Sequence, residues 1–279
     1  MNRFILENIV KGALLEDLQQ GDITSEAIFD KDFMAEAVFM AKAGGILAGL
    51  PVVSEVFHQL NRDMICLKSL SDGAEVSPGT EIATWQGPIR SILAGERVAL
   101  NFLQRLSGIA TQTARLVNLK GDLPAKIVDT RKTTPGLRML EKYAVRMGGG
   151  CNHRFNLADA VLIKDNHIEA CGSITEAVRR AKDYIPHTMT IEVEVETKAQ
   201  VEEALAAGAD IIMLDNMPAP EMRAMVELIN QRALVEASGN VDEHTIKEIA
   251  ATGVDIISVG AITHSVRALD ISLDVRKRE

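Results

Sequence analysis

Short apolar runs separated by turn-forming pairs characterise the first part of the chain, up to about Gln86. The runs lie at residues 37–41, 64–70 and 81–85. The pairs that break them, Gly44-Gly45, Asp72-Gly73 and Pro78-Gly79, favour tight turns. This pattern predicts an α+β region built mainly of antiparallel pieces.

The pattern becomes helical between Pro88 and Lys120. Apolar residues recur there at three- and four-residue steps, which places Ala99, Phe102, Leu103, Leu106 and Ala110 on one face of a helix. The opposite face carries Arg97, Asn101 and Arg105.

After Leu123, short β-branched runs alternate with helix-like segments. The six runs lie at residues 126–130, 161–164, 190–195, 210–215, 234–238 and 255–260. Amphipathic segments at 199–207 and 243–251 are followed by Gly208 and Gly253, where helix ends are expected. This order is typical of βα units in a parallel sheet. The regular spacing of the six runs favours a closed or nearly closed α/β barrel over an open sheet. No GxGxxG opens a helix after any run, which removes the main support for a dinucleotide-binding fold.

Composition narrows the classes of function. The 279 residues are 47% hydrophobic and 25% charged, which is enough for a large core. A net charge of −9 and an aromatic fraction of 4% argue against binding to nucleic acids or anionic membranes, which require clustered basic surface. The longest uncharged stretch, residues 43–54, is shorter than the ~20 apolar residues that cross a bilayer.

The N-terminus and the cysteines indicate a cytoplasmic protein. Charges interrupt the N-terminal segment where a signal peptide would be continuously apolar. Cys66, Cys151 and Cys171 contain no CxxC pair and are interpreted as buried, reduced thiols. Cys151 and His153 together suggest zinc, but further ligands at suitable spacing are missing.

Polar residues end each of the six runs, at the edge where barrels of this kind place their chemistry. These ends are Asp129-Thr130-Arg131-Lys132, Lys164-Asp165-Asn166-His167, Glu192 with Glu194, Asp215-Asn216, Ser238-Gly239-Asn240 and Val259-Gly260-Ala261. A solvated cap explains any one of these ends but not all six together. We therefore predict the functional site at this edge.

The segment from residue 129 to 154 is basic within an acidic protein. Its cations are Arg131, Lys132, Arg138, Lys142, Arg146 and Arg154. A solvated helix face accounts for Lys142 and Arg146. Arg131, Lys132 and Arg154 are interpreted as anion-binding residues, because arginine pairs with planar carboxylates and phosphates.

The remaining ends predict a phosphate and a sugar. Small residues at 238–240 and 259–261 leave backbone N–H groups free to hold a phosphate, although turns also use glycine. Glu194 and Asp215 stand on neighbouring runs and suit sugar hydroxyls, a hydrated magnesium ion or a developing cation. The predicted ligand carries carboxylates, a phosphate and a ribose.

Specific motifs occur in order along nearly the whole chain. They are GDITS (21–25), AKAGGILAG (41–49), GERVALNFLQRLSGIAT (95–111), DTRKTTPGLRMLEKYAV (129–145), the glycine run with Asn152-His153-Arg154, VLIKDNHI (161–168), EVEVE (192–196), IIMLDN (211–216), EASGN and ISVGA. With them the chain resembles the quinolinate phosphoribosyltransferase family, and DTRKTTPGLR is the most specific match. The resemblance implies an α/β fold, with an α+β N-terminal sandwich at 1–108 and an incomplete parallel α/β barrel at 109–264. Residues 265–279 are a candidate to rejoin the first domain.

The resemblance also implies an activity. The family transfers the phosphoribosyl group of phosphoribosyl pyrophosphate to quinolinate with decarboxylation, giving nicotinate mononucleotide, pyrophosphate and CO2. This pentosyltransferase reaction uses Mg²⁺ and is a step of de novo NAD biosynthesis. The family forms a homodimer with shared active sites, and the sequence leaves a hexamer open.

Residue roles follow from the matched motifs. The resemblance implies a quinolinate pocket formed by Arg131, His153, Arg154 and Lys164, together with the partner subunit's Arg97. Lys132 is similar to a lysine between quinolinate and pyrophosphate, and Thr130 is a further substrate-binding candidate. The motifs place Glu194 and Asp215 near ribose and magnesium, as direct or water-mediated ligands, and Ser238, Gly239, Asn240, Val259, Gly260 and Ala261 at the 5′-phosphate. The candidate catalytic residues are Lys132, Lys164, Glu194 and Asp215.

Some positions depart from the family or have no pattern. Asn240 stands where many relatives have glycine, and Phe155-Asn156 replaces a more glycine-rich stretch, but backbone donors are retained at both places. Four histidines without partner patterns are interpreted as structural or surface residues, namely His58, His187, His244 and His264.

Three other interpretations stay open. The first is a paralogue of the same fold that is encoded with molybdate transporters and has no established substrate. The second is an aldolase that uses Lys164 as a Schiff-base nucleophile. The third is a non-catalytic protein that binds phosphorylated metabolites.

Overall fold

The structure is a computed structural model that describes residues 1–277, and its chain forms two compact units. Unit 1 consists of Met1–Ala114, Thr133–Gly149 and the chain from Ser265 onward, and unit 2 of Arg115–Lys132 and Gly150–His264. The sequence did not indicate that Thr133–Gly149 would belong with unit 1. The domain boundaries at 1–108 and 109–264 stay a prediction, and residues 278–279 of the candidate returning segment lie outside the described residues.

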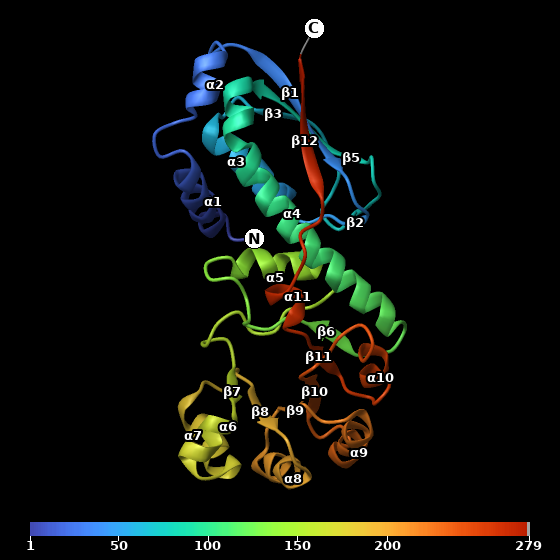
Figure 1. Ribbon diagram of the computed structural model, residues 1–279. Coiled ribbons are helices and arrows are strands. Elements are labelled where there is room, and N and C mark those ends of the chain that lie inside the picture. Colours follow the sequence, from blue (N-terminus) through green and yellow to red (C-terminus); the bar gives the residue numbers. More distant parts are fainter. Residues whose placement is uncertain (278–279) are drawn as a thin grey trace. The chain divides into compact units, whose positions relative to one another are not determined.

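Unit 1 contains a four-stranded antiparallel sheet, as the turn-rich N-terminal pattern predicts (Figure 1). Its order is β12 (Ile271–Lys277), β1 (Met34–Ala41), β5 (Glu81–Pro88) and β3 (Ile65–Ser69). A short ladder joins β2 (Gly45–Ile46) to β4 (Glu75–Val76). The other elements of unit 1 are α1 (Arg3–Asp17), α2 (Ile23–Ile28), α3 (Leu50–Leu60), α5 (Arg138–Met147) and most of α4 (Ile89–Lys120).

The helix α4 confirms the helical pattern between Pro88 and Lys120. Its apolar face is buried, with Leu103 fully covered, while Arg97 on the polar face is exposed. The polar face is not solvated throughout, because Arg105 donates to the buried carboxylate of Glu141 at 2.6 Å. Gly108 allows a close backbone approach, since a Cβ there would lie 2.2 Å from the carbonyl oxygen of Arg267.

Unit 2 is built on a six-stranded parallel sheet, which confirms all six predicted runs. Its order is β6 (Lys126–Val128), β11 (Ile256–Ser258), β10 (Leu234–Ser238), β9 (Ile211–Asp215), β8 (Ile191–Val195) and β7 (Val161–Ile163). Within the described residues, β6 and β7 follow each other in the chain but are not paired in the sheet. The barrel is therefore incomplete, as the family resemblance implies.

Helices follow the strands from β7 to β11, and α7, α8 and α9 pack against the strands (Figure 1). They are α6 (Asp165–Cys171), α7 (Ile174–Tyr184), α8 (Lys198–Ala207), α9 (Ala219–Ile229), α10 (Ile246–Ala250) and α11 (Ala261–His264). Gly208 ends α8 in the left-handed conformation, as predicted. The helix expected at 243–251 begins only at Ile246, because the Asp242 side chain accepts hydrogen bonds from the N–H groups of His244 and Thr245 and holds a turn there.

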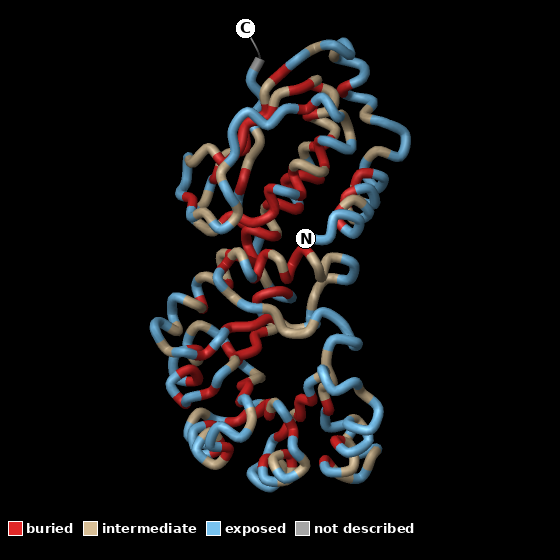
Figure 2. The backbone as a smooth tube through the Cα atoms, turned by 180° about the vertical axis from the view of Figure 1, so that it is seen from behind, coloured by how far each residue is buried: buried red, intermediate tan, exposed pale blue. Residues whose placement is uncertain are grey.

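Apolar and acidic residues alternate along β8, and of its five residues only Glu194 is not fully buried. In β8, Ile191, Val193 and Val195 are buried, and the intervening positions are Glu192 and Glu194. Figure 2 shows buried positions gathered on the strands and on the inner parts of the helices. The alternation places both glutamates of β8 on one face of the strand.

Two features outside the sheets complete the description. The three cysteines are free, but Cys66 and Cys151 are exposed rather than buried as expected. Among residues 1–277, no helix combines the length and the apolar composition needed to cross a lipid bilayer.

Candidate functional site

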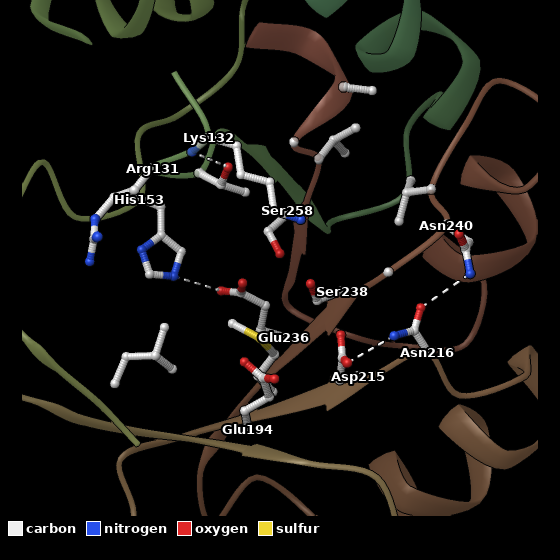
Figure 3. A pocket seen from close by; sticks show the side chains of 18 of the residues that line it. Arg131, Lys132, His153, Glu194, Asp215, Asn216, Glu236, Ser238, Asn240 and Ser258 are labelled. Atoms are coloured by element: carbon white, nitrogen blue, oxygen red, sulfur yellow. Dashed lines mark hydrogen bonds and ion pairs between the residues drawn. The ribbon is translucent and has the colours of Figure 1, made fainter. Parts of the chain in front are cut away.

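A pocket of ≈ 700 Å³ lies at the carboxyl ends of the parallel strands in unit 2 (Figure 3). Side chains from all six strand ends line it. Its predicted members are Thr130, Arg131, Lys132, His153, Arg154, Lys164, Glu194, Asp215, Ser238, Gly239, Asn240, Val259, Gly260 and Ala261. Arg97 belongs to unit 1, where it is exposed on α4.

The parallel register explains why the acids gather here. Glu194 pairs with Met213 and Met213 with Glu236, so these three residues stand at the same level of β8, β9 and β10. Asp215 and Ser238 form the next level, two residues further along their strands. Since alternate residues of a strand share a face, all five point into the pocket.

The cationic part of the pocket comes from the segments after β6 and β7. Arg154 donates to the carbonyl oxygen of Ala160 at 2.8 Å, which fixes its guanidinium. Burial and the nearby charge of Arg131 lower the pKa of Arg154. Two arginines held close enough to repel each other favour an anion between them.

Not every cation of the basic segment belongs to this pocket. Arg138, Lys142 and Arg146 lie on α5 in unit 1. Arg146 is exposed, but Lys142 is fully buried, so the interpretation of Lys142 as part of a solvated helix face is wrong. The helical period places Lys142 on the same face as Val145, three residues further on and also buried.

The predicted acidic pair, Glu194 and Asp215, lines the same pocket as Arg131 and Arg154. Lys164 Nζ approaches Glu194 Oε2 at 2.7 Å in a partly exposed ion pair. Burial and the charge of Glu194 raise the pKa of Asp215, while a hydrogen bond from Asn216 opposes this shift. Two carboxylates whose negative charges interact favour a positive group or a cation between them.

The predicted site residue His153 forms a cluster with two buried glutamates, Glu192 and Glu236, to which the sequence assigned no role in the site. His153 Nε2 lies 3.2 Å from Glu192 Oε2 and 3.6 Å from Glu236 Oε2. Both glutamates are almost completely buried, and the Oε1 atom of each has no hydrogen-bond partner. Burial and the charge of Glu192 raise the pKa of Glu236 to about 7.

The geometry of His153 decides between a proton and a metal ion in this cluster. Its ligand atoms lie close enough to those of the two glutamates to hold an ion. However, Nδ1 accepts a hydrogen bond from the Arg154 N–H at 2.8 Å, so the proton of a neutral ring is on Nε2. A metal requires a bare Nε2, and therefore the arrangement favours a proton shared between the carboxyl groups.

The loop that carries His153 is held by a buried carboxylate. Asp129 is fully buried and accepts hydrogen bonds from Asn152 Nδ2 at 2.6 Å and from the His153 N–H at 2.9 Å. This explains why the polar run after β6 begins with an acid. Asp129 acts on the pocket through the loop and does not line it within the described residues.

Four further polar residues line the pocket without having been assigned a role from the sequence: Asn216, Glu236, Ser258 and His264. Asn216 is the first residue after β9, and Ser258 is the last residue of β11. Glu236 stands two residues before Ser238 on the same face of β10. His264 is exposed, in agreement with its interpretation as a structural or surface residue, and it also lines the pocket. Period-2 counting back from Ser238 would have found Glu236, whereas His264 has no local signal.

Comparisons with known proteins agree over the whole chain. Two family models match, described as the quinolinate phosphoribosyl transferase N-terminal domain over residues 22–107 and its C-terminal domain over residues 109–274. A Bacillus subtilis protein named probable nicotinate-nucleotide pyrophosphorylase (carboxylating) is 48% identical over 275 residues, covering 99% of this chain and 95% of the relative.

Solved structures give the same result. NadC from Streptococcus pyogenes has a TM-score of 0.96 at 44% identity, and the match covers 100% of this chain and 99% of that one. The nicotinate-nucleotide pyrophosphorylase of Francisella tularensis has a TM-score of 0.95 at 42% identity, with 99% and 98% covered.

Proposed function

The chain belongs to the quinolinate phosphoribosyltransferase family, and we propose that its parallel-sheet pocket binds both substrates of that reaction. The enzyme transfers the phosphoribosyl group of phosphoribosyl pyrophosphate to quinolinate with decarboxylation, in NAD biosynthesis. Its products are nicotinate mononucleotide, pyrophosphate and CO2. The observation that carries the proposal is that one pocket unites a cationic side, two interacting carboxylates and small-residue turns.

The cationic side is assigned to quinolinate. Arg131, Arg154 and Lys164 would bind its two carboxylates, because a dianion relieves the repulsion between the arginines. His153 borders this side, and Lys132 would lie between quinolinate and the departing pyrophosphate, near Thr130. These cations bind and orient the substrate, and the reaction asks little acid–base work of them.

The acidic side is assigned to the sugar. Departure of pyrophosphate leaves positive charge on the ribose, which Glu194 and Asp215 would stabilise until the quinolinate nitrogen attacks. CO2 then leaves, the electron pair of the broken C–C bond stays on the ring carbon next to the positively charged nitrogen, and that carbon takes up a proton from water to give nicotinate mononucleotide. Lys132 and Lys164 complete this catalytic set.

Magnesium is part of the proposal. Hard oxygen ligands suit Mg²⁺, and Glu194 and Asp215 provide carboxylates whose mutual repulsion a cation would relieve. They would hold the ion directly or through water, and its charge would assist the departure of pyrophosphate.

The 5′-phosphate is assigned to the turns after β10 and β11. Ser238, Gly239 and Asn240 form the first turn, and Val259, Gly260 and Ala261 form the second. Small side chains leave room for a phosphate to reach backbone N–H groups.

The proposed assembly is a homodimer in which the partner subunit's Arg97 completes the quinolinate pocket. The exposed position of Arg97 on α4 supports this assignment. Sedimentation analysis would distinguish the dimer from a hexamer. A cytoplasmic location belongs to the same proposal and is supported by the three free cysteines.

The test is a product assay with two parallel substrates. Purified protein is incubated with phosphoribosyl pyrophosphate, Mg²⁺ and either quinolinate or nicotinate, and nicotinate mononucleotide is measured by chromatography. We expect product from quinolinate alone and none after chelation of Mg²⁺. Lack of product from quinolinate would refute the proposal and favour the transporter-linked paralogue or a binding protein. The aldolase alternative is disfavoured because Lys164 is ion-paired with Glu194, whereas Schiff-base formation needs a neutral amine.

A further inference from the structure

Asn216 connects two parts of the pocket through its side chain. Its Nδ2 donates to Asp215 Oδ2 at 2.8 Å, and its Oδ1 accepts from Asn240 Nδ2 at 3.1 Å. The N–H of Asn216 also donates to the carbonyl oxygen of Ser238 at 2.9 Å. Figure 3 shows Asn216 between Asp215 and Asn240, joined to both by dashed lines. The strand ends of β9 and β10 are thereby linked at their side chains as well as their backbones.

The backbone around this link is specialised. Asn216 and Asn240 have φ of 53° and 50°, in the left-handed region that costs energy for residues other than glycine. Gly239 also has a positive φ and packs against the Asn216 side chain, since a Cβ there would come within 2.1 Å of Asn216 Oδ1. Three left-handed residues at the ends of two neighbouring strands, around one side-chain link, indicate that the arrangement is maintained for a purpose.

Resting on the proposed function, we propose that Asn216 is a positioning residue that links the turn at Ser238–Asn240 to the carboxylate of Asp215. When the turn receives the 5′-phosphate, the Asn240–Asn216 contact fixes the amide that holds Asp215 toward the ribose. Asn240 thus has a second role besides contact with phosphate.

The direction of each hydrogen bond supports this role. The side-chain NH2 of Asn216 donates to Asp215, and its carbonyl oxygen accepts from Asn240. A movement of either neighbour therefore disturbs the same amide. The charge of Glu194 acts on Asp215 as well. The donor from Asn216 therefore opposes a like-charge interaction that would turn the carboxylate away.

The test uses glycine variants, because glycine keeps the left-handed backbone without strain. Asn216→Gly, Asn240→Gly and the double variant are compared in kcat and in KM for phosphoribosyl pyrophosphate. Asn230→Gly is the matched control, since Asn230 has φ of 46° at the exposed end of α9. We expect Asn216→Gly to lower kcat ~10- to 100-fold, as for loss of a hydrogen bond to a charged group, and Asn240→Gly to lower it ~3- to 10-fold.

The double variant gives the decisive measurement. If the two asparagines act as one unit, it lies within ~2-fold of Asn216→Gly alone. Multiplication of the two single effects would overturn the link, as would a kcat for Asn216→Gly equal to that of Asn230→Gly. Asn216→Asp is the second variant if Asn216→Gly fails to fold. This variant keeps Oδ1 as the acceptor for Asn240 but puts a carboxylate oxygen in place of the NH2 group that donates to Asp215. An unchanged kcat would also overturn the proposal.

Failure of the proposed function would be recognised separately. It would leave wild-type protein without product from quinolinate. The link would then be judged by calorimetric titration with phosphoribosyl pyrophosphate, in which both single variants and the double must weaken binding to a similar extent. Wild-type protein that neither turns over quinolinate nor binds phosphoribosyl pyrophosphate would end both proposals.

Discussion

The buried carboxyl of Glu236 should make the stability of the protein depend on pH, and Glu236→Gln should remove that dependence. The pKa of Glu236 is raised from 4.5 to about 7 by burial and by the charge of Glu192. Each unit of such a difference corresponds to ~1.4 kcal/mol. Ionising the group in the folded state therefore costs about 3 kcal/mol, an upper value for a pair that shares its protons.

The sign follows from the raised pKa. Because the folded state prefers the protonated carboxyl, this contribution is fully present below the unfolded pKa of about 4.5. It is lost as the pH rises toward about 7. Glutamine has a similar shape, cannot ionise, and its amide can donate to Glu192 as the protonated carboxyl does.

The assay is urea unfolding followed by circular dichroism at pH 5 and pH 8. Between these values we expect the free energy of unfolding of the wild type to fall by up to ~3 kcal/mol more than that of Glu236→Gln. Glu221→Gln, on the exposed part of α9, is the matched control and should behave as the wild type. An identical pH dependence in Glu236→Gln and the wild type would show that the buried cluster is not held by a shared proton.

Three further predictions concern the reaction. Arg131→Ala should raise the KM for quinolinate ~10- to 100-fold and the KM for phosphoribosyl pyrophosphate by less. Activity near that of the wild type would contradict the assignment of the quinolinate pocket. Gly239→Ala should weaken phosphoribosyl pyrophosphate binding at least ~10-fold by displacing Asn216, whereas Gly79→Ala, with a similar positive φ and no near neighbour, is the control and should keep full affinity. Arg97→Ala and Arg131→Ala proteins are unfolded and refolded together and assayed at a quinolinate concentration too low for either variant alone. The mixture should recover about a quarter of wild-type activity if sites are shared between two subunits, and no recovery would refute sharing.

The sequence analysis located the strands of unit 2 well because their signal is local. Each of β8, β9 and β10 is a short, mostly apolar run, and each run is closed or followed by polar residues, so both the strand and the pocket residues at its end could be predicted. The same logic placed Glu194 and Asp215 on one edge of the sheet.

Features that depend on contacts between distant segments were missed. Glu192 and Glu236 come from strands separated by β9, and His153 reaches them from a loop fixed by Asp129. No spacing along the chain brings these side chains together. Likewise, the burial of Lys142 depends on the packing of α5 within unit 1, which a charge pattern does not reveal.

The order of the strands accounts for the proposed arrangement of the ligand. Lys164 and the Arg131–Lys132 pair follow β7 and β6, the two edge strands that flank the opening of the barrel. Glu194 and Asp215 follow β8 and β9, and the two small-residue turns follow β10 and β11. Passing from β7 toward β11, the sheet presents a cation, then carboxylates, then backbone N–H groups. Nicotinate mononucleotide presents a pyridine carboxylate, a ribose and a phosphate in the same order. An incomplete barrel suits such a ligand, because its unpaired edges leave room at one end for cations from two separate segments.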